Sequence, residues 1–192
     1  MKKFLTTLCF LSPMLFLAQE ANNAEGSSFT AGNEIKWDVL GLITETKIQL
    51  TYEHQFLPKW SAGLSAATYQ SNKDKDHFDT STDKQLKNYD IIPYIRYHLS
   101  PNQNSYYFAE GSLGVNSGKY KHIERLDANN QAIYQLQQGE YTDLALGLAV
   151  GYKYILKEHF LGEILVGGGQ NILNDDSPKY ISRVAISIGY KF

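Results

Sequence analysis

The chain has 192 residues with 18 basic and 20 acidic side chains, so its net charge at pH 7 is only −2. This balance, and the lack of a basic stripe, argue against binding of nucleic acid. Aromatic residues make up 13% of the chain and include 14 tyrosines. Such an amphipathic surplus suits a boundary between apolar and aqueous surroundings.

The first 18 residues have the pattern of a secretory signal peptide. Two lysines precede an apolar run over residues 4–17, which is followed by a small residue. The run is shorter than the ~20 residues that a spanning helix needs. Cys9, the only cysteine, lies inside the run, so we expect no lipid anchor and no disulfide in the exported chain. Residues 19–32 are predicted to form a short periplasmic N-terminal segment.

From residue 33 to residue 192, apolar and polar residues alternate in eight segments. A period of two is typical of strands that have two unlike faces. No segment after the signal peptide shows the 3.6-residue period of a helix. The predicted strands are, in chain order, 33–43, 46–56, 60–69, 88–99, 106–115, 141–154, 160–168 and 182–192.

The connections between the predicted strands alternate between short and long. Apart from the short link after the first strand, tight turns would gather at one end of the sheet and polar loops at the other, as in up-and-down membrane barrels. The short connections are 57–59, 101–104 and 157–159, and the long polar ones are 70–87, 117–140 and 170–179.

The composition of the two strand faces indicates which face is enclosed. Four strands carry mainly Gly, Ala and Ser on their polar face, as expected where side chains converge inside a narrow barrel. The apolar face carries no charge in the body of any strand. In hydrocarbon every backbone polar group needs a partner within the protein, so such a sheet must close. We predict an all-β fold, an eight-stranded antiparallel up-and-down transmembrane β-barrel over residues 33–192; the alternative is a soluble periplasmic sheet.

Aromatic residues on the apolar face are predicted to lie near the tight turns. A girdle at a membrane–water boundary explains such a placement. The girdle residues are Trp37, Tyr52, Trp60, Tyr97, Tyr107, Tyr154, Phe160 and Tyr190.

The enclosed face carries charges of both signs in nearly equal number. An unpaired charge in a dry lumen costs on the order of several kcal/mol, so we predict a network of ion pairs that plugs the lumen. A gated proton or ion path is the alternative. The predicted interior acids are Glu34, Asp38, Glu53, Asp90, Glu110, Asp143 and Glu163, and the bases are Lys36, Lys47, Arg96, Lys153, Arg183 and Lys191. The predicted network comprises Arg96, Glu110, Asp143, Lys153, Glu163 and Arg183, and is centred on Arg96, Glu110, Glu163 and Arg183.

The final strand, with alternating apolar residues, Tyr190 and a terminal Phe192, resembles the signal that the barrel assembly machinery of the outer membrane recognises. The whole exported chain resembles small eight-stranded outer-membrane barrels of the OmpA, OmpX and OmpW kind. The opening resembles that of an uncharacterised family of short barrels, through Asn33, Ile35, Lys36, Asp38, Leu50, Tyr52, Glu53 and Trp60. That family has no established activity, so the resemblance implies no site.

No catalytic, cofactor-binding or metal-binding motif is evident. The acidic stretch 74–83 lacks the Gly turn and terminal Glu of a calcium-binding loop, and the five histidines lack zinc-ligand spacing. His98 and Ser100 are similar to the His-x-Ser of outer-membrane lipid A deacylases, but they are predicted to face the lumen at the periplasmic end. Pro93, in mid-strand, removes a ladder donor, which indicates either a tolerated bulge or lateral access for a lipid or apolar ligand, as in OmpW-like barrels.

The predicted function is that of an outer-membrane barrel with a plugged lumen, acting in a structural or interaction role through its extracellular loops. A carrier of small hydrophobic molecules through the barrel wall is the second hypothesis, and a lipid-modifying outer-membrane enzyme is the third. We expect no enzymatic activity and no cofactor. The expected partners are outer-membrane lipid, the barrel assembly machinery and an unknown extracellular partner.

Overall fold

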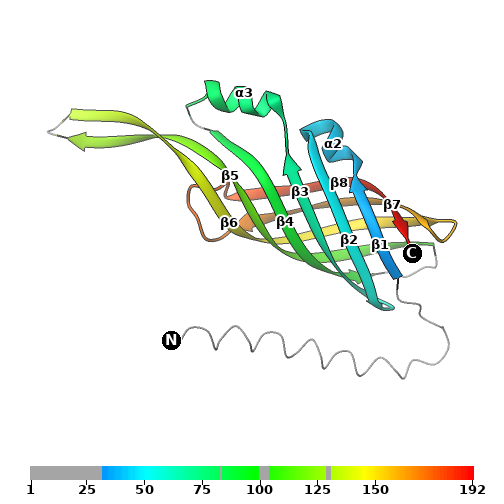
Figure 1. The fold of residues 1–192 in the computed structure, drawn as a ribbon. Helices are drawn as coiled ribbons and strands as arrows, with labels where there is room; N and C mark the ends of the chain where they lie inside the picture. Colours follow the sequence, from blue (N-terminus) through cyan, green and yellow to red (C-terminus); the bar gives the residue numbers. More distant parts are fainter. Residues whose placement is uncertain (1–31, 83, 100–103, 129–130) are drawn as a thin grey trace, which may run out of the picture. The chain divides into compact units, whose positions relative to one another are not determined.

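The computed structural model describes residues 32–82, 84–99, 104–128 and 131–192. The predicted signal peptide and nearly all of the predicted segment 19–32 lie outside the described residues. The elements are, in chain order, β1 (Gly32–Asp38), α2 (Val39–Glu45), β2 (Lys47–Leu57), β3 (Trp60–Tyr69), α3 (Asn72–Thr80), β4 (Lys84–His98), β5 (Ser105–Ala128), β6 (Gln131–Leu156), β7 (Phe160–Asn171) and β8 (Tyr180–Lys191) (Figure 1).

The eight strands form a closed antiparallel barrel in which each strand pairs with the next along the chain. β1 pairs with β8 and closes the sheet. Asn33 and the terminal Phe192 extend this seam, because the backbone N–H of each donates to the carbonyl oxygen of the other, at 3.1 and 2.9 Å. The closed wall confirms the predicted all-β up-and-down barrel.

The first predicted strand, 33–43, is too long, because the chain turns into helix α2 after Asp38. The Asp38 carboxylate accepts a hydrogen bond from the backbone N–H of Gly41, at 3.2 Å, and so caps the helix. Thr46, with a left-handed φ of 51°, ends the helix. The local side-chain hydrogen bond gives the backbone an alternative to the strand ladder, which the apolar alternation alone did not reveal.

Helix α3 lies in the connection 70–87, which was wrongly predicted to contain no helix. The hydroxyl oxygen of Ser71 accepts from the backbone N–H of Asp74, at 3.1 Å, and caps its first turn. The buried side chain of Phe78 lies beneath Lys121 of β5, whose ammonium is 4.5 Å from the ring centroid. Because so short a helix is marginal by itself, this tertiary contact contributes to its stability.

The predicted loop 117–140 is instead the continuation of two strands. β5 and β6 pair in one unbroken register from Ser105–Tyr154 to Ala128–Gln131. Their hairpin projects beyond the other strands, as Figure 1 shows. The polar composition of the stretch indicated a loop, but a ladder can continue through polar residues once the barrel has set its register.

Pro93 does not shift the register of the strands around it. β4 pairs with β5 in the same register on both sides of the proline, through Ile91–Val115 and Tyr94–Ser112. Pro93 also pairs with Leu64 of β3. The irregularity of the β4–β5 ladder lies instead between Lys87 and Tyr89, near the loop end.

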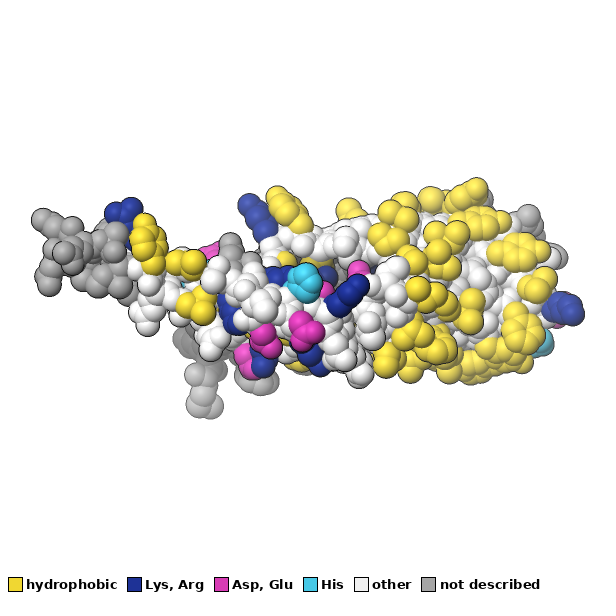
Figure 2. Space-filling view, turned by 90° about the horizontal axis from the view of Figure 1, so that it is seen from above, with side chains coloured by type: hydrophobic (Ala, Val, Ile, Leu, Met, Phe, Trp, Pro, Cys, Tyr) yellow, Lys and Arg dark blue, Asp and Glu magenta, His cyan; other side chains and the backbone are white. Residues whose placement is uncertain are grey.

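The outer face of the barrel is apolar and exposed, and the inner face is buried. In β6, Leu146 and Leu148 are 54% and 76% exposed, whereas Ala145 and Ala149 are at most 5% exposed. Figure 2 shows hydrophobic side chains gathered over one part of the barrel, with charged side chains toward the loop end. This distribution is that of a transmembrane barrel. Among the described residues, no helix is long and apolar enough to cross a bilayer.

Leu148 provides a test of what contacts the outer wall. Leu148→Lys should lower the free energy of unfolding by about 2–4 kcal/mol in lipid vesicles, because a charge near the bilayer midplane loses its hydration. The measurement is urea unfolding followed by tryptophan fluorescence.

The matched control is Leu136→Lys on the projecting hairpin, where Leu136 is 47% exposed and lies beyond the apolar band. It should change the same free energy by no more than about 0.5 kcal/mol, since surface substitutions are usually near neutral. Equal effects of the two substitutions would contradict a lipid-facing wall.

Candidate functional site

Eight charged side chains meet in the barrel interior and form what we call the interior ion cluster. They come from seven strands, at positions on the enclosed face. Seven of them are at most 5% exposed, and Arg183 is half-buried. The acids are Glu34, Glu53, Glu110 and Glu163, and the bases are Lys36, Arg96, Lys153 and Arg183. Four acids and four bases make the cluster formally neutral.

Arg96 connects three of the four acids. Its Nη1 lies 2.7 Å from both Glu53 and Glu163, and its Nε lies 2.7 Å from Glu110. Nη2 donates to the second carboxylate oxygen of Glu163 at 2.8 Å. The guanidinium therefore holds Glu163 in a two-pronged geometry, which is the strong and directional form of such a pair.

Glu53 is the acid with the most partners. Lys36 and Lys153 donate to it at 2.5 and 3.0 Å, in addition to Arg96. The hydroxyl of Tyr94 donates at 3.0 Å and that of Ser61 at 2.7 Å. Strand alternation placed Glu53 inside the barrel, but it was not among the predicted network residues, because sequence spacing does not show which side chains meet across a lumen.

The remaining pairs complete the cluster. Lys153 lies 2.6 Å from Glu34 and 3.7 Å from Glu163, and Lys36 lies 2.8 Å from Glu163. Arg183 pairs with Glu110. The structure thus brings together five of the six predicted network residues, namely Arg96, Glu110, Lys153, Glu163 and Arg183.

Asp143, the sixth predicted network residue, lies apart from the cluster. Its carboxylate accepts hydrogen bonds from the backbone N–H groups of Leu144, Leu173 and Asn174, at 2.6, 2.8 and 3.1 Å, and from the hydroxyl of Ser177. Asp143 therefore organises the connection between β7 and β8. Its charge is satisfied by backbone donors rather than by a cation, which spacing along the chain could not indicate.

Aromatic and aliphatic side chains fill the space beside the ion cluster. The Arg96 guanidinium lies 4.5 Å from the ring centroid of Tyr94 and 4.1 Å from that of Phe108, which is fully buried. Toward the tight turns, an apolar core continues from Phe108 through Tyr106, Ile155 and Leu161, whereas Leu165 of the same core lies on the loop side of Glu163. Ionic and apolar layers therefore both occupy the interior.

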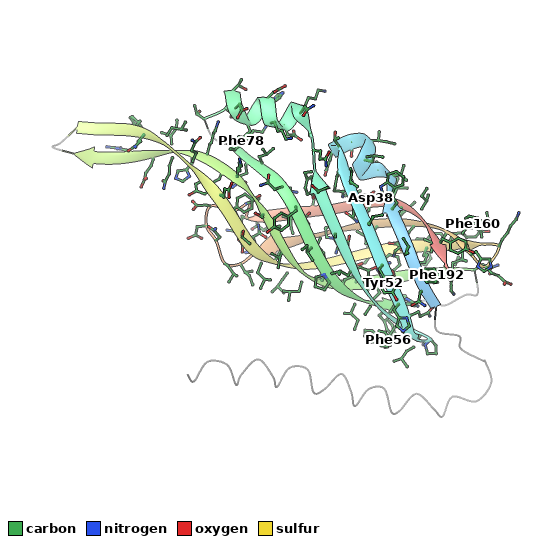
Figure 3. The ribbon with its side chains drawn as sticks, in the orientation of Figure 1. Asp38, Tyr52, Phe56, Phe78, Phe160 and Phe192 are labelled. Carbon is green, nitrogen blue, oxygen red and sulfur yellow. The ribbon has the colours of Figure 1, made fainter. Side chains whose placement is uncertain are left out.

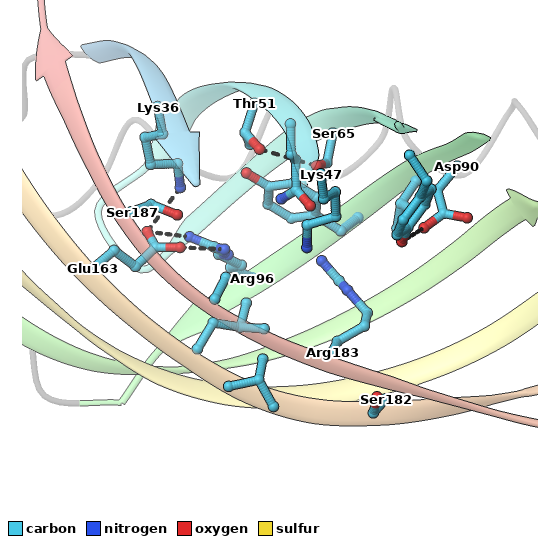
Figure 4. A pocket seen from close by; sticks show the side chains of 17 residues that line it. Lys36, Lys47, Thr51, Ser65, Asp90, Arg96, Glu163, Ser182, Arg183 and Ser187 are labelled. Carbon is cyan, nitrogen blue, oxygen red and sulfur yellow. Dashed lines mark hydrogen bonds and ion pairs between the residues drawn. The ribbon is translucent and has the colours of Figure 1, made fainter. Parts of the chain in front are cut away.

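A small cavity of about 40 Å³ lies on the loop side of the cluster (Figure 4). Lys47 and Arg183 line it together with Asp90. Lys47 is paired with Asp38 at 2.8 Å, and Asp90 accepts from the hydroxyl of Tyr69 at 2.6 Å. One buried water needs ~10–15 Å³ of cavity volume, so this cavity holds a few waters at most.

Most of the predicted girdle residues lie near the tight turns on the outer face. Figure 3 shows Tyr52, Phe56, Phe160 and Phe192 at this end, and Phe78 of α3 at the other. Neighbouring strands bring pairs of rings together, with centroids 5.0 to 5.6 Å apart for Trp60–Tyr97 and Phe160–Tyr190. Tyr107 and Tyr154, exposed by 59% and 49%, also face outward near these turns, from β5 and β6.

Trp37 was placed wrongly in the girdle. It is 42% exposed on the outer face, but it pairs with Leu50 of β2 and Ile188 of β8, farther from the turns than Tyr52 and Tyr190. The error follows from the first strand, which was assumed to extend to residue 43 and in fact ends at Asp38. Trp37 is therefore near the loop end of its strand.

His98, which was compared above with the histidine of lipid A deacylases, has structural partners in the barrel interior. Ser100, of the His98–Ser100 pair, lies outside the described residues. His98 is buried, stacks on Tyr106 at 4.3 Å between ring centroids, and lies 3.2 Å from the hydroxyl of Ser61. In the described part of the chain, no three His, Cys, Asp or Glu side chains are arranged to hold a metal ion.

Comparison with solved structures shows three to which this chain is similar. The N-terminal β-barrel domain of OprF from Pseudomonas aeruginosa has a TM-score of 0.52 and 11% identity, over 84% of this chain and 96% of that domain. Neisserial surface protein A has a TM-score of 0.49 and 11% identity, over 84% and 92% of the two chains. The attachment invasion locus protein Ail of Yersinia pestis has a TM-score of 0.46 and 13% identity, over 84% and 95%.

The likeness to the OprF domain is one of fold, since this chain is also a small eight-stranded β-barrel. No curated protein matches the sequence. Residues 10–188, nearly the whole chain, match a family described as "Protein of unknown function (DUF3575)". The chain belongs to this uncharacterised family, and its fold is that of a small, closed eight-stranded β-barrel.

Proposed function

We propose that this protein is an exported outer-membrane barrel whose lumen is closed by the interior ion cluster and whose extracellular part contacts a partner. The observation that carries the proposal is the neutral cluster of eight buried or half-buried charges at the centre of the barrel. An eight-stranded barrel has an interior just wide enough for side chains to fill it.

The energetics of the cluster support a lumen that stays closed. A mobile ion would have to separate pairs such as Arg96–Glu163, whose atoms are 2.7 Å apart in a buried site. Removing one partner of a buried pair typically costs about 3–5 kcal/mol, because the other charge remains without compensation. The apolar layer around Phe108 adds a second barrier on the turn side.

The outer surface supports a location in the outer membrane. Apolar side chains face outward from all eight strands, and aromatic residues gather at the turn end, as at a membrane–water boundary. Phe192 closes the barrel seam with Asn33, so the terminal residue that resembles an assembly signal is also part of the wall. We propose that a cleaved signal peptide over residues 1–18 directs export and that the assembly machinery recognises Tyr190 and Phe192.

A non-enzymatic role is also part of the proposal. The contact between Ser61 and His98 supports it, because this contact has a structural explanation. Both side chains are buried beside the ion cluster, and the Ser61 hydroxyl already donates to Glu53. The projecting β5–β6 hairpin and helix α3 offer larger surfaces at the loop end. Recognition by loops on a rigid scaffold is therefore the more favourable use of this fold.

Glu53→Gln tests the energetic role of the cluster. The substitution keeps the side-chain shape but removes one of the four negative charges, so the buried cluster carries one uncompensated positive charge and the free energy of unfolding should fall by about 3 kcal/mol. Urea unfolding in detergent micelles measures this change.

The control is Glu140→Gln, which removes an exposed partner 4.0 Å from Lys119. Exposed pairs contribute about 0–1 kcal/mol, so its unfolding midpoint should stay close to that of the unmodified protein. If Glu53→Gln lowered the free energy of unfolding as little as Glu140→Gln, the ion cluster would not stabilise the barrel.

The closed lumen has a direct electrical test. Purified protein in planar bilayers should give no sustained conductance steps, because paired side chains occupy the passage. Insertion is checked separately by fractionation with outer membrane and by faster migration of unheated than boiled protein on a denaturing gel. Sustained steps from inserted protein would refute the closed lumen, and absence from the outer-membrane fraction would refute the location.

Deletion of Phe192 tests the role of the terminal residue. Without it, both backbone hydrogen bonds to Asn33 and the proposed signal are lost, so the amount of protein in the outer-membrane fraction should fall several-fold. Phe192→Tyr, which keeps the backbone and an aromatic ring, should restore most of it. Refolding of both purified variants in detergent separates a defect of assembly from one of stability, since only the former would leave refolding intact.

A further inference from the structure

Within the closed barrel each strand has a neighbour on both sides. The projecting part of the β5–β6 hairpin, in contrast, has exposed strand edges. β4 pairs with β5 only as far as Lys121, and β7 pairs with β6 only from Ala145. Beyond these residues β5 and β6 pair only with each other in the described part of the chain. Each then presents one row of backbone groups without a neighbouring strand (Figure 1).

The free edge of β6 can be assigned residue by residue. The carbonyl oxygen of Leu144 accepts from the backbone N–H of Ile172, at 3.0 Å, so the backbone groups of Leu144 point away from β5. In an antiparallel ladder, successive residues point their backbone N–H and C=O groups alternately toward and away from the partner strand. The β5–β6 register is unbroken, so this alternation continues along β6. The residues that point their N–H and C=O groups outward are therefore Tyr134, Leu136, Gln138, Glu140 and Thr142.

This edge lacks the features that usually prevent pairing with another chain. Natural edge strands are commonly protected by Lys, Pro or a bulge. Residues 134–142 contain no Lys, Arg or Pro, Glu140 is their single charge, and the ladder has no bulge. The β5 edge is shorter and carries Glu124 and Arg125, and Lys121 below it lies against α3.

The side chains beside the free edge are partly apolar. Tyr134 is 67% exposed and Leu136 is 47% exposed, and Leu136 pairs across the ladder with Ile123, which is 50% exposed. These three side chains share one face of the hairpin, because directly paired residues and those two apart along a strand point the same way. An added strand could bury them and hydrogen-bond to the edge at once.

We propose that the β6 edge over residues 134–142 binds an extended polypeptide segment, which adds to the hairpin as a third strand. Unpaired N–H and C=O groups that recur at every second residue match the backbone of another chain, and a lipid or a glycan has no such repeat. The segment should carry apolar residues at alternate positions, opposite Tyr134 and Leu136, and no proline at the bonding positions. The inference rests on the proposed function, since the hairpin must lie outside the membrane to meet this segment.

Gln138→Pro is the decisive variant. It removes an N–H that points to the free edge and leaves the bonds to β5, and proline is tolerated where a strand N–H faces solvent. Gln138→Ala is the matched control, because it removes the same side chain and keeps the N–H. Leu136→Lys is a second variant that protects the edge by charge without changing the backbone.

The probe is a phage-displayed library of random 12-residue peptides, selected on the intact protein in detergent micelles. We expect enriched peptides with apolar residues at every second position. A synthetic copy should bind Gln138→Ala within about twofold of the unmodified protein, and Gln138→Pro and Leu136→Lys at least about tenfold more weakly, since tenfold corresponds to ~1.4 kcal/mol. N-methylation of the peptide at alternate amides should also abolish binding, whereas methylation at the intervening amides should not.

Three results would overturn the inference. Equal affinity of the selected peptide for Gln138→Pro would place binding elsewhere, and the absence of any enriched peptide would leave the edge without a ligand of this class. Self-association that Gln138→Pro abolishes would assign the edge to a second copy of the chain. The gel shift on heating verifies folding of every variant, and outer-membrane fractionation is scored separately, so a failure of the proposed location is distinguishable from a failure of peptide binding.

Discussion

The architecture depends on the need of every backbone N–H and C=O group for a partner inside an apolar medium. A sheet with an apolar outer face can meet that need only by closing on itself. β1 and β8 provide the closure, and the mutual hydrogen bonds of Asn33 and Phe192 extend it to the last residue of the chain. The first and last strands are therefore as necessary to the wall as any strand between them.

Closure of so few strands leaves a narrow interior, and this narrowness determines how charges can be accommodated. A single buried carboxylate would be costly, but Glu53 accepts from three cations and two hydroxyls, and its cationic partners contact the other acids of the cluster. Gly151, a small residue on the same face, leaves room for Phe108, because a Cβ atom there would clash with the Phe108 ring. The interior is thus a packed polar core whose balance of charge is part of its stability.

The constraint on the backbone is relaxed where the chain leaves the apolar band. Water can satisfy exposed backbone groups there, so the chain forms α2 and α3 and extends β5 and β6 as a two-stranded ribbon. The same relaxation allows an uncovered edge such as that of β6 beside Leu136. The features that support the proposed binding role consequently lie in the part of the molecule that the membrane does not constrain.

Alternation of apolar and polar residues determined the number of strands and which residues share a face, because a period of two follows directly from strand geometry. The Gly, Ala and Ser residues on one face then indicated which face is enclosed. Together these patterns placed Arg96, Glu110, Lys153, Glu163 and Arg183 in the interior. Only the tertiary structure decided that Glu53 is the acid with the most partners, that Asp143 caps a loop instead of joining the network, and that Trp37 lies away from the girdle. Partners across a lumen, helix caps and the length of a projecting hairpin depend on strand register and on contacts between distant residues, and a one-dimensional pattern contains neither.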